Sequence, residues 1–184
     1  MAGTDNFIKY LESLFEGEQS ATTALESVDI SNHMLQTAAA AQAAGAHDSL
    51  VAAALLHDIG HWIDRKTDLA LVPEEDRRHE DIAAERLAPH FGPEVCQPVQ
   101  LHVAAKRYLC AVEPEYFAKL SPGSVHSLNL QGGPMTEEEI RAFEAIPEHR
   151  DAVKLRRWDE YGKAPETQVP PFSHYRELLH SLAR

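Results

Sequence analysis

The stretch SLVAAALLHDIGHWI at residues 49–63 constrains the fold of this chain more than any other feature of its sequence. Its apolar residues predict a helix, beginning at about Asp48, that is buried in a core. The run ends, however, in His57 and Asp58, with His61 one helical turn further on. Adjacent helical residues point about 100° apart, so His57 and Asp58 do not share a face. The pair can straddle a site between helices, as a metal centre, an acid–base pair or a buried polar pair.

Helices are expected in most of the remaining sequence. Alanine and leucine are frequent and runs of β-branched residues are few, which favours an all-α fold. Apolar spacing and capping residues predict helices at about residues 7–15, 32–44, 48–63, 79–91, 93–111, 136–146, 151–161 and 173–184. Pro73 and a run of charged residues mark residues 64–78, and prolines and glycines interrupt residues 113–135; we expect both segments to be loops, the second partly irregular. The sequence therefore predicts a compact helical bundle.

The length of 184 residues is sufficient for one domain with its own apolar core. We expect a single domain over residues 1–184, with its core at about residues 20–163. A proline-rich extension and a short helix then occupy residues 164–184.

Charge and segment lengths argue against several kinds of partner. The formal charge of -12 would repel nucleic acid and anionic lipid. No apolar stretch approaches the roughly 20 residues of a membrane span, and the first residues do not resemble a signal peptide. If Cys96 and Cys110 share one helix they lie about 21 Å apart, too far for a disulfide. We therefore expect a cytoplasmic protein that binds neither nucleic acid nor membrane, with an oligomeric state that the sequence leaves open.

Several histidines and aspartates fall inside the predicted helices, and they belong to five different segments. A lone histidine of this kind is more often a hydrogen-bonded core residue than a metal ligand. A bundle core can nevertheless build a metal site when facing helices each contribute one or two inward ligands. Because a carboxylate has two oxygens, Asp58 could bridge two metals. The candidates are His33, His57, Asp58, His61, His79, His102 and Asp159.

A site for a single metal ion would require only some of these candidates. His33, His57, Asp58 and Asp159 would suffice for it, and the helical positions of His79 and His102 would then be a coincidence.

The order of His33, the pair His57 and Asp58, and Asp159 resembles the signature of the HD-domain superfamily of helical, metal-dependent proteins. Further motifs resemble a narrower group, the phosphonate-cleaving, PhnZ-like diiron oxygenases. These motifs are HVAAKRYL at 102–109, LQGGPM at 130–135 and RRWDEYGK at 156–163. The resemblance covers roughly residues 20–176 and implies a bundle of the HD-domain type with a dimetal site in its core.

The resemblance also implies a cofactor and its ligands. Two iron ions in the mixed-valent Fe(II)/Fe(III) state would be present, with O2 as co-substrate. Residues matching the ligands of one iron are His33, His57, Asp58 and Asp159. Residues matching those of the other are Asp58, His79 and His102, so Asp58 would bridge the pair.

Substrate contacts follow partly from spacing and partly from the resemblance. Lys106 lies one helical turn beyond His102, and Arg156 lies three residues before Asp159 on the same helix face. Asp58, Lys106 and His61 would be the catalytic residues. One position departs from the family pattern. Family members have a tyrosine three residues before the glutamate that corresponds to Glu26, whereas this chain has Thr23 there. The residues implied to bind substrate are Glu26, His61, Lys106, Ser124, Ser127, Gln131 and Arg156.

The implied activity is oxidative cleavage of the carbon–phosphorus bond of a 1-hydroxyalkylphosphonate. The favoured substrate is (R)-2-amino-1-hydroxyethylphosphonate, which would give glycine and phosphate. A trimethylammonium analogue and hydroxymethylphosphonate are alternatives. A metal-dependent phosphohydrolase of the same fold and a non-catalytic regulatory module are rival interpretations. Lys106, residues 131–135 and Arg156 favour the oxygenase, and a regulatory module would be expected to have lost ligands.

Overall fold

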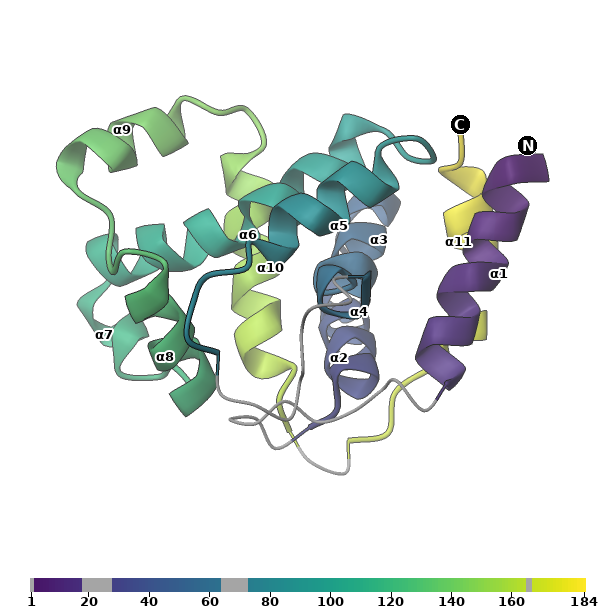
Figure 1. Cartoon of the computed structure of the whole chain (residues 1–184), viewed down its shortest axis with the longest axis horizontal. Coiled ribbons are helices and arrows are strands. Elements are labelled where there is room, and N and C mark those ends of the chain that lie inside the picture. Colours follow the sequence, from purple (N-terminus) through teal and green to yellow (C-terminus); the bar gives the residue numbers. More distant parts are fainter. Residues whose placement is uncertain (1, 18–27, 64–72, 165–166) are drawn as a thin grey trace.

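The computed structural model describes residues 2–17, 28–63, 73–164 and 167–184 (Figure 1). Within these ranges the regular elements are helices and there is no β-strand, which confirms the all-α prediction. The elements are α1 (Ala2–Glu16), α2 (Ile30–Ala43), α3 (Asp48–Leu56), α4 (Gly60–Ile63), α5 (His79–Leu87), α6 (Pro93–Val112), α7 (Pro114–Phe117), α8 (Pro122–Leu130), α9 (Glu137–Glu144), α10 (His149–Tyr161), η1 (Phe172–Tyr175) and α11 (Arg176–Ser181). Among the described residues, no helix has both the length and the apolarity to cross a membrane.

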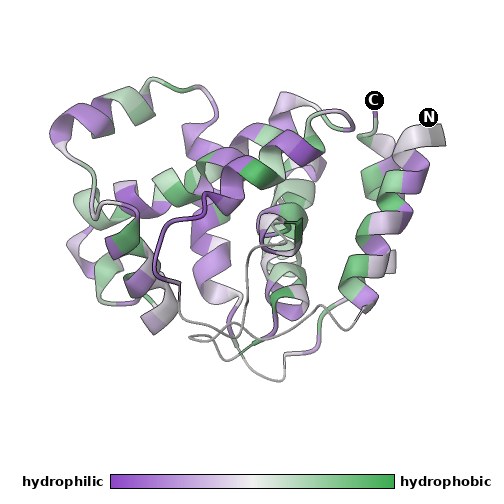
Figure 2. Cartoon of the chain, in the orientation of Figure 1, coloured by the Kyte–Doolittle hydropathy of each residue, from purple (hydrophilic) through white to green (hydrophobic). Residues whose placement is uncertain are grey.

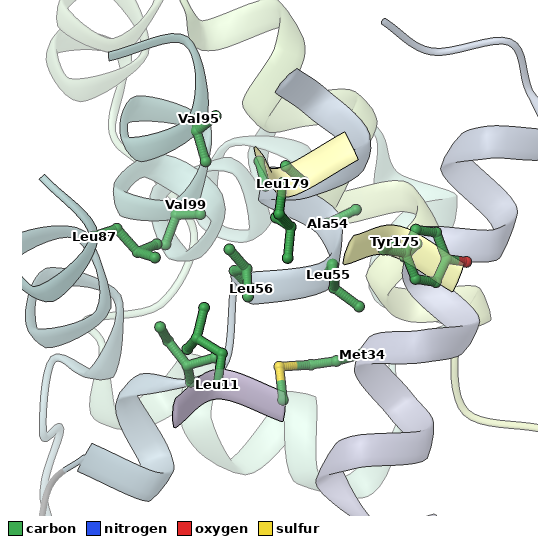
Figure 3. Close-up of a cluster of buried hydrophobic side chains, with 14 of the residues drawn as sticks. Leu11, Met34, Ala54, Leu55, Leu56, Leu87, Val95, Val99, Tyr175 and Leu179 are labelled. Atoms are coloured by element: carbon green, nitrogen blue, oxygen red, sulfur yellow. The ribbon is translucent and has the colours of Figure 1, made fainter. Parts of the chain in front are cut away.

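Helix α3 forms the centre of the apolar core. Every residue from Leu50 to Leu56 is buried, on all sides of the helix. The small side chains of residues 52–54 let neighbouring helices approach closely, and α2, α6, α10 and α11 all contact α3. Figure 3 shows Leu55 and Leu56 among side chains from α1, α2, α5, α6 and α11. Each fully buried leucine stabilises the fold by about 2 kcal/mol, so the end of α3 is held firmly in the middle of the molecule.

Both ends of the described chain lie against this core. Helices α1 and α11 lie side by side, and the N and C ends are close together in Figure 1. The hydroxyl of Thr4 donates a hydrogen bond to the carbonyl of Arg184 at 3.3 Å. Leu11 and Leu179 belong to the same buried cluster as α3, while the outer face of α1 is hydrophilic (Figure 2). Because both ends share this cluster, we propose that residues 1–184 form one domain.

Helices α7, α8 and α9 lie on the opposite side of the molecule from α1 and α11 (Figure 1). Leu109 and Cys110 of α6, Tyr116 of α7 and Leu128 of α8 form a second, smaller apolar cluster. The capping box predicted at Thr136 begins α9, as expected. This side of the molecule therefore has its own packing, which positions α7 and α8 next to the C-terminal half of α6.

The helix predicted to carry the HDIGH motif is interrupted, so the prediction of one continuous helix is wrong. Helix α3 ends at Leu56, and turn residues separate it from α4. The ring Nδ1–H of His57 donates to the carbonyl of Ala54 at 2.9 Å, competing with the backbone hydrogen bonds of the helix. The amide of His61 then donates to the carbonyl of Asp58 at 3.1 Å, across three residues instead of the four of an α-helix.

The predicted loop before α9 is also more helical than expected. Ser121 caps α8, because its Oγ accepts a hydrogen bond from the Ser124 amide at 3.1 Å. Gly132 and Gly133 follow α8 with φ of 93° and 74°, a backbone conformation that favours glycine. Proline and glycine here mark the two ends of a helix. Ser124 and Ser127 therefore lie one turn apart on the same face of α8.

Candidate metal centre

The residues predicted as metal ligands come from different helices and meet in the core. Helix α10 contacts α2, α3 and α6, and α5 contacts α6, so the packing of these helices brings the residues together. His57 and Asp58 follow the buried helix α3 directly, which explains why an apolar run ends in polar residues. The predicted ligands are His33 on α2, His57 and Asp58 in the turn after α3, His79 at the start of α5, His102 on α6 and Asp159 on α10.

The first group of potential ligands surrounds one oxygen of Asp58. The Nε2 atom of His33 lies 3.2 Å from Nε2 of His57 and 3.2 Å from Oδ1 of Asp159. Oδ2 of Asp58 lies 3.6 Å from the His33 Nε2 and 3.5 Å from the His57 Nε2. The ligand atoms of His33, His57 and Asp58 are close enough together to bind one metal ion, and the carboxylate of Asp159 lies beside them.

The second group surrounds the other oxygen of Asp58. Oδ1 lies 3.2 Å from Nε2 of His79 and 3.5 Å from Nε2 of His102. The two imidazole nitrogens are themselves 3.1 Å apart. The ring of His61 stacks on that of His79 with 4.1 Å between centroids, and its ligand atom also lies within reach of a metal shared with Asp58 and His79. The two oxygens of Asp58 are thus divided between two groups of nitrogens.

Hydrogen bonds to the backbone determine which nitrogen of each ring faces the centre. The Nδ1–H group of His33 donates to the carbonyl of Gly162 at 2.9 Å, and that of His102 donates to the carbonyl of Val99 at 2.7 Å. His57 donates to Ala54 in the same way. A neutral imidazole that donates from Nδ1 carries a lone pair on Nε2. The Nε2 lone pairs and the carboxylate oxygens therefore converge, and this donor set suits a cation.

The electrostatics of the centre agree with bound positive charge. Burial lowers the pKa of His57 to about 4 and that of His61 to about 3, so both rings are neutral near pH 7. Burial also opposes a charge on His33, yet the neighbouring carboxylate of Asp159 raises the pKa of that ring. The centre thus stabilises positive charge beside Asp159, as a metal site made of imidazoles and carboxylates requires.

Lys106 lies beside this centre and is 3% exposed. Its Nζ donates to Oγ of Ser127 at 2.6 Å, and among the described residues it makes no ion pair. Burial, with a smaller contribution from the charge of Arg156, lowers the pKa of Lys106 to about 7, while Asp159 and Asp58 act in the opposite direction. A buried ammonium that lacks a close carboxylate is suited to an anionic ligand.

The other predicted substrate contacts that the structure describes lie on α8, directly after it, or on α10. Ser124 and Ser127 belong to α8, and Ser124 is buried. Gln131 follows α8, and its buried Oε1 has no hydrogen-bond partner among the described residues. Arg156 is buried and forms hydrogen bonds to protein acceptors, including Asp159. Glu26 and Thr23 lie outside the described residues.

Three residues near the centre were missed by the sequence analysis. Glu80 is buried, and its Oε2 lies 3.5 Å from Nδ1 of His79. Glu160 pairs with Arg156, a contact that their spacing of four residues on a helix could have indicated. The contact of Tyr116 with Arg156 has no comparable signal in the sequence, because the two residues are 40 positions apart in the chain.

Comparisons with known proteins agree with this geometry. A family model described as HD domain matches residues 30–145. A [1-hydroxy-2-(trimethylamino)ethyl]phosphonate dioxygenase (glycine-betaine-forming) from Leisingera caerulea is 38% identical over 177 residues, which are 96% of this chain and 90% of the relative. A hydroxymethylphosphonate dioxygenase from Gimesia maris is 45% identical over 157 residues, 85% of this chain and 78% of the relative.

A third relative extends the similarity to a virus. An uncharacterised protein of Acanthamoeba polyphaga mimivirus is 34% identical over 149 residues, 80% of this chain and 68% of the viral protein. The family model covers more than half of the chain, and the two dioxygenases cover most of it. The chain therefore belongs to the HD domain family and, within it, to the oxygenases that include these phosphonate dioxygenases.

Proposed function

We propose that the chain is an iron- and O2-dependent oxygenase that cleaves the carbon–phosphorus bond of a 1-hydroxyalkylphosphonate. The observation that carries the proposal is the division of the Asp58 oxygens between two groups of imidazole nitrogens, with Lys106 beside them. Two named relatives support the substrate class, because the substrates in both names carry a hydroxyl on the carbon bonded to phosphorus. We also propose a cytoplasmic location, supported by two cysteines that are free thiols.

In this proposal the ligands are those predicted from the sequence. His33, His57, Asp58 and Asp159 would hold one iron, and Asp58, His79 and His102 the other. When bound, the iron pair would supply a Lewis acid for the substrate oxygens and the redox chemistry for O2. Because these ligands meet in the core, where His57 and Asp58 directly follow the buried residues 50–56 of α3, bulk water would be excluded from the reaction.

The remaining residues would bind and orient the anion. Lys106 and Ser127, already hydrogen-bonded to each other, present an ammonium and a hydroxyl to the phosphonate oxygens. Ser124 lies one turn away on the same face of α8. Gln131 follows that helix, and its buried Oε1, which has no hydrogen-bond partner among the described residues, would accept from the hydroxyl of the substrate and not from its phosphonate. His61, neutral and stacked on His79, can accept or donate one hydrogen bond at the substrate.

The overall reaction balances without a further reductant. The C1–P bond breaks, one oxygen atom of O2 enters the carboxylic acid and the other enters the phosphate. C1 is oxidised and O2 is reduced. Within the class, the sequence predicts (R)-2-amino-1-hydroxyethylphosphonate as the substrate, whereas the two relatives are named for the trimethylammonium and hydroxymethyl members. Glu26, which would recognise the amino group, lies outside the described residues.

Phosphate release tests the proposal. Protein loaded with ferrous ion and partly oxidised would be incubated with each of the three hydroxyphosphonates, with O2 and under argon. We expect stoichiometric phosphate and carboxylic acid from at least one of them, only in the presence of O2. Release of phosphate from phosphate esters under argon, with none from any phosphonate, would instead identify a phosphohydrolase.

Replacing Lys106 with alanine is expected to weaken substrate binding. A hydrogen bond to a charged group contributes about 1.5–3 kcal/mol, so the KM for the phosphonate should rise by roughly 10- to 100-fold. Lys154, an exposed lysine paired with Asp151, provides the control, and Lys154→Ala should leave KM unchanged. A KM that is unaffected in Lys106→Ala would show that this lysine does not contact the anion.

A further inference from the structure

Arg156 is buried and its guanidinium is almost fully committed to protein acceptors. Its Nε–H donates to the hydroxyl of Tyr116 at 2.9 Å, and Nη2 donates to Oγ of Ser124 at 3.0 Å. Nη2 also donates to the carboxylate of Glu160, and Nη1 donates to Oδ2 of Asp159. A guanidinium has five N–H donors. Within the described part of the chain, these four hydrogen bonds leave at most one donor available.

The charge of Arg156 is also compensated. Asp159 and Glu160 both form ion pairs with it, and the side chains of Arg156 and Asp159 are 5% and 4% exposed. A phosphonate that accepted hydrogen bonds from two N–H groups of Arg156 would have to displace one of its present acceptors, and a displaced carboxylate would be left unpaired in the interior at a cost of several kcal/mol. Lys106 differs, because its one hydrogen bond among the described residues is to a neutral hydroxyl.

The hydrogen bonds of Asp159 indicate what Arg156 does instead. Oδ2 of Asp159 accepts from Arg156, while Oδ1 lies 3.2 Å from Nε2 of His33 and 4.0 Å from Nε2 of His57. By holding Oδ2, the arginine determines that Oδ1 of Asp159 faces the first group of ligands.

We propose that Arg156 is a positioning residue that acts on the reaction through Asp159, and that Tyr116 and Glu160 hold its guanidinium in the required orientation. The ring of Tyr116 is fixed by the second apolar cluster, where it packs with Leu109 and Leu128. Its hydroxyl is therefore an acceptor in a defined place. This inference rests on the proposed function, since it assumes that Asp159 binds a metal.

Two variants and one control test the proposal. Arg156→Lys keeps the charge but loses the planar fork that reaches several acceptors at once. Tyr116→Phe removes only the hydroxyl that accepts from Nε. Tyr108→Phe is the matched control, because the Tyr108 hydroxyl bonds to Glu144 at the surface, at 2.8 Å. Each protein would be titrated with ferrous ion under argon, its thermal unfolding measured with and without metal, and kcat and KM determined.

Loss of a residue that orients a metal ligand typically weakens metal affinity by about 10- to 100-fold. We expect this loss for one of the two ions in Arg156→Lys and Tyr116→Phe, with a smaller metal-induced rise in Tm. The value of kcat should fall, whereas KM for the phosphonate should change by less than about threefold. Tyr108→Phe should match the wild type in all of these measurements.

Three results would overturn the inference. If the Arg156→Lys variant binds both ions normally but its KM rises tenfold or more, Arg156 is a substrate contact. Tyr116→Phe that is destabilised equally with and without metal, at unchanged affinity, would make Tyr116 merely structural. Wild-type protein that binds no ferrous ion would refute both this inference and the metal centre. Wild-type protein that binds two ions yet cleaves no phosphonate would refute the proposed function alone, and the affinities would still decide the role of Arg156.

Discussion

Replacing Asp58 with alanine is expected to remove both metal ions and to abolish phosphate release. Oδ2 of Asp58 faces His33 and His57, and Oδ1 faces His79 and His102, so one substitution deletes a ligand from each group. Loss of a residue that only orients a ligand typically costs about 10- to 100-fold in metal affinity, and loss of a shared ligand should exceed this. Iron per chain after anaerobic loading and gel filtration, followed by the phosphate assay, measures both effects.

Two further variants make this result specific. Asp58→Asn retains one carbonyl oxygen of similar shape, and because an amide oxygen is a weaker ligand than a carboxylate we expect it to keep at most one ion. Asp5→Ala removes an exposed aspartate that pairs with Lys9 at the surface, and it should keep both ions. Two tightly bound ions in Asp58→Ala would refute the bridging role.

Replacing Gly60 with alanine is expected to destabilise the fold and to displace His79. A Cβ atom at Gly60 would lie 2.0 Å from the carbonyl oxygen of His79 and 2.8 Å from its carbonyl carbon. These are backbone atoms at the start of α5, so they cannot move aside as the tip of a flexible side chain could. Alanine is favoured over glycine in a helix by about 1 kcal/mol, but this gain is too small to offset a contact so far below van der Waals distance.

Overpacking of this kind typically costs about 1–3 kcal/mol, which corresponds to roughly 2–12 °C in Tm for a chain of this size. Because His79 would move with the backbone, metal affinity of the second group should fall as well, by about 10-fold or more. Gly3→Ala is the control, since nothing lies within 4 Å of a Cβ there. It should leave Tm and metal binding unchanged. Unaltered metal binding in Gly60→Ala would show that α4 and α5 can separate without loss of the centre.

Much of the helical structure could be predicted from local sequence. The spacing of apolar residues in α1, the proline at the start of α6 and the capping box before α9 were sufficient, because helix formation depends on residues within a few turns of one another. The end of α3 was not predictable in this way. It depends on a hydrogen bond between the His57 ring and the carbonyl of Ala54, and the identity of the residue does not reveal that bond.

The candidate centre was likewise predictable from the sequence only in part. The motif placed His57 and Asp58 together. His33, His79, His102 and Asp159 were candidates because they are polar residues inside predicted helices, and the resemblance divided the set between two metals. The fold gathers all of these residues in the core. That these residues bind iron remains a prediction. Their environment came only from the structure, since the carbonyl that orients His33 belongs to Gly162, 129 positions away in the sequence.

The sequence by itself thus determined the fold class and the candidate ligands, because helical periodicity and short motifs are local properties. Tertiary structure alone decided how the two oxygens of Asp58 are shared and which acceptors surround Arg156. Periodicity indicates which face of a helix is buried, but not which atoms of another helix that face will meet. The contact between Tyr116 and Arg156 depends on the packing of both α7 and α10 against α6, and only the folded chain brings those two residues together.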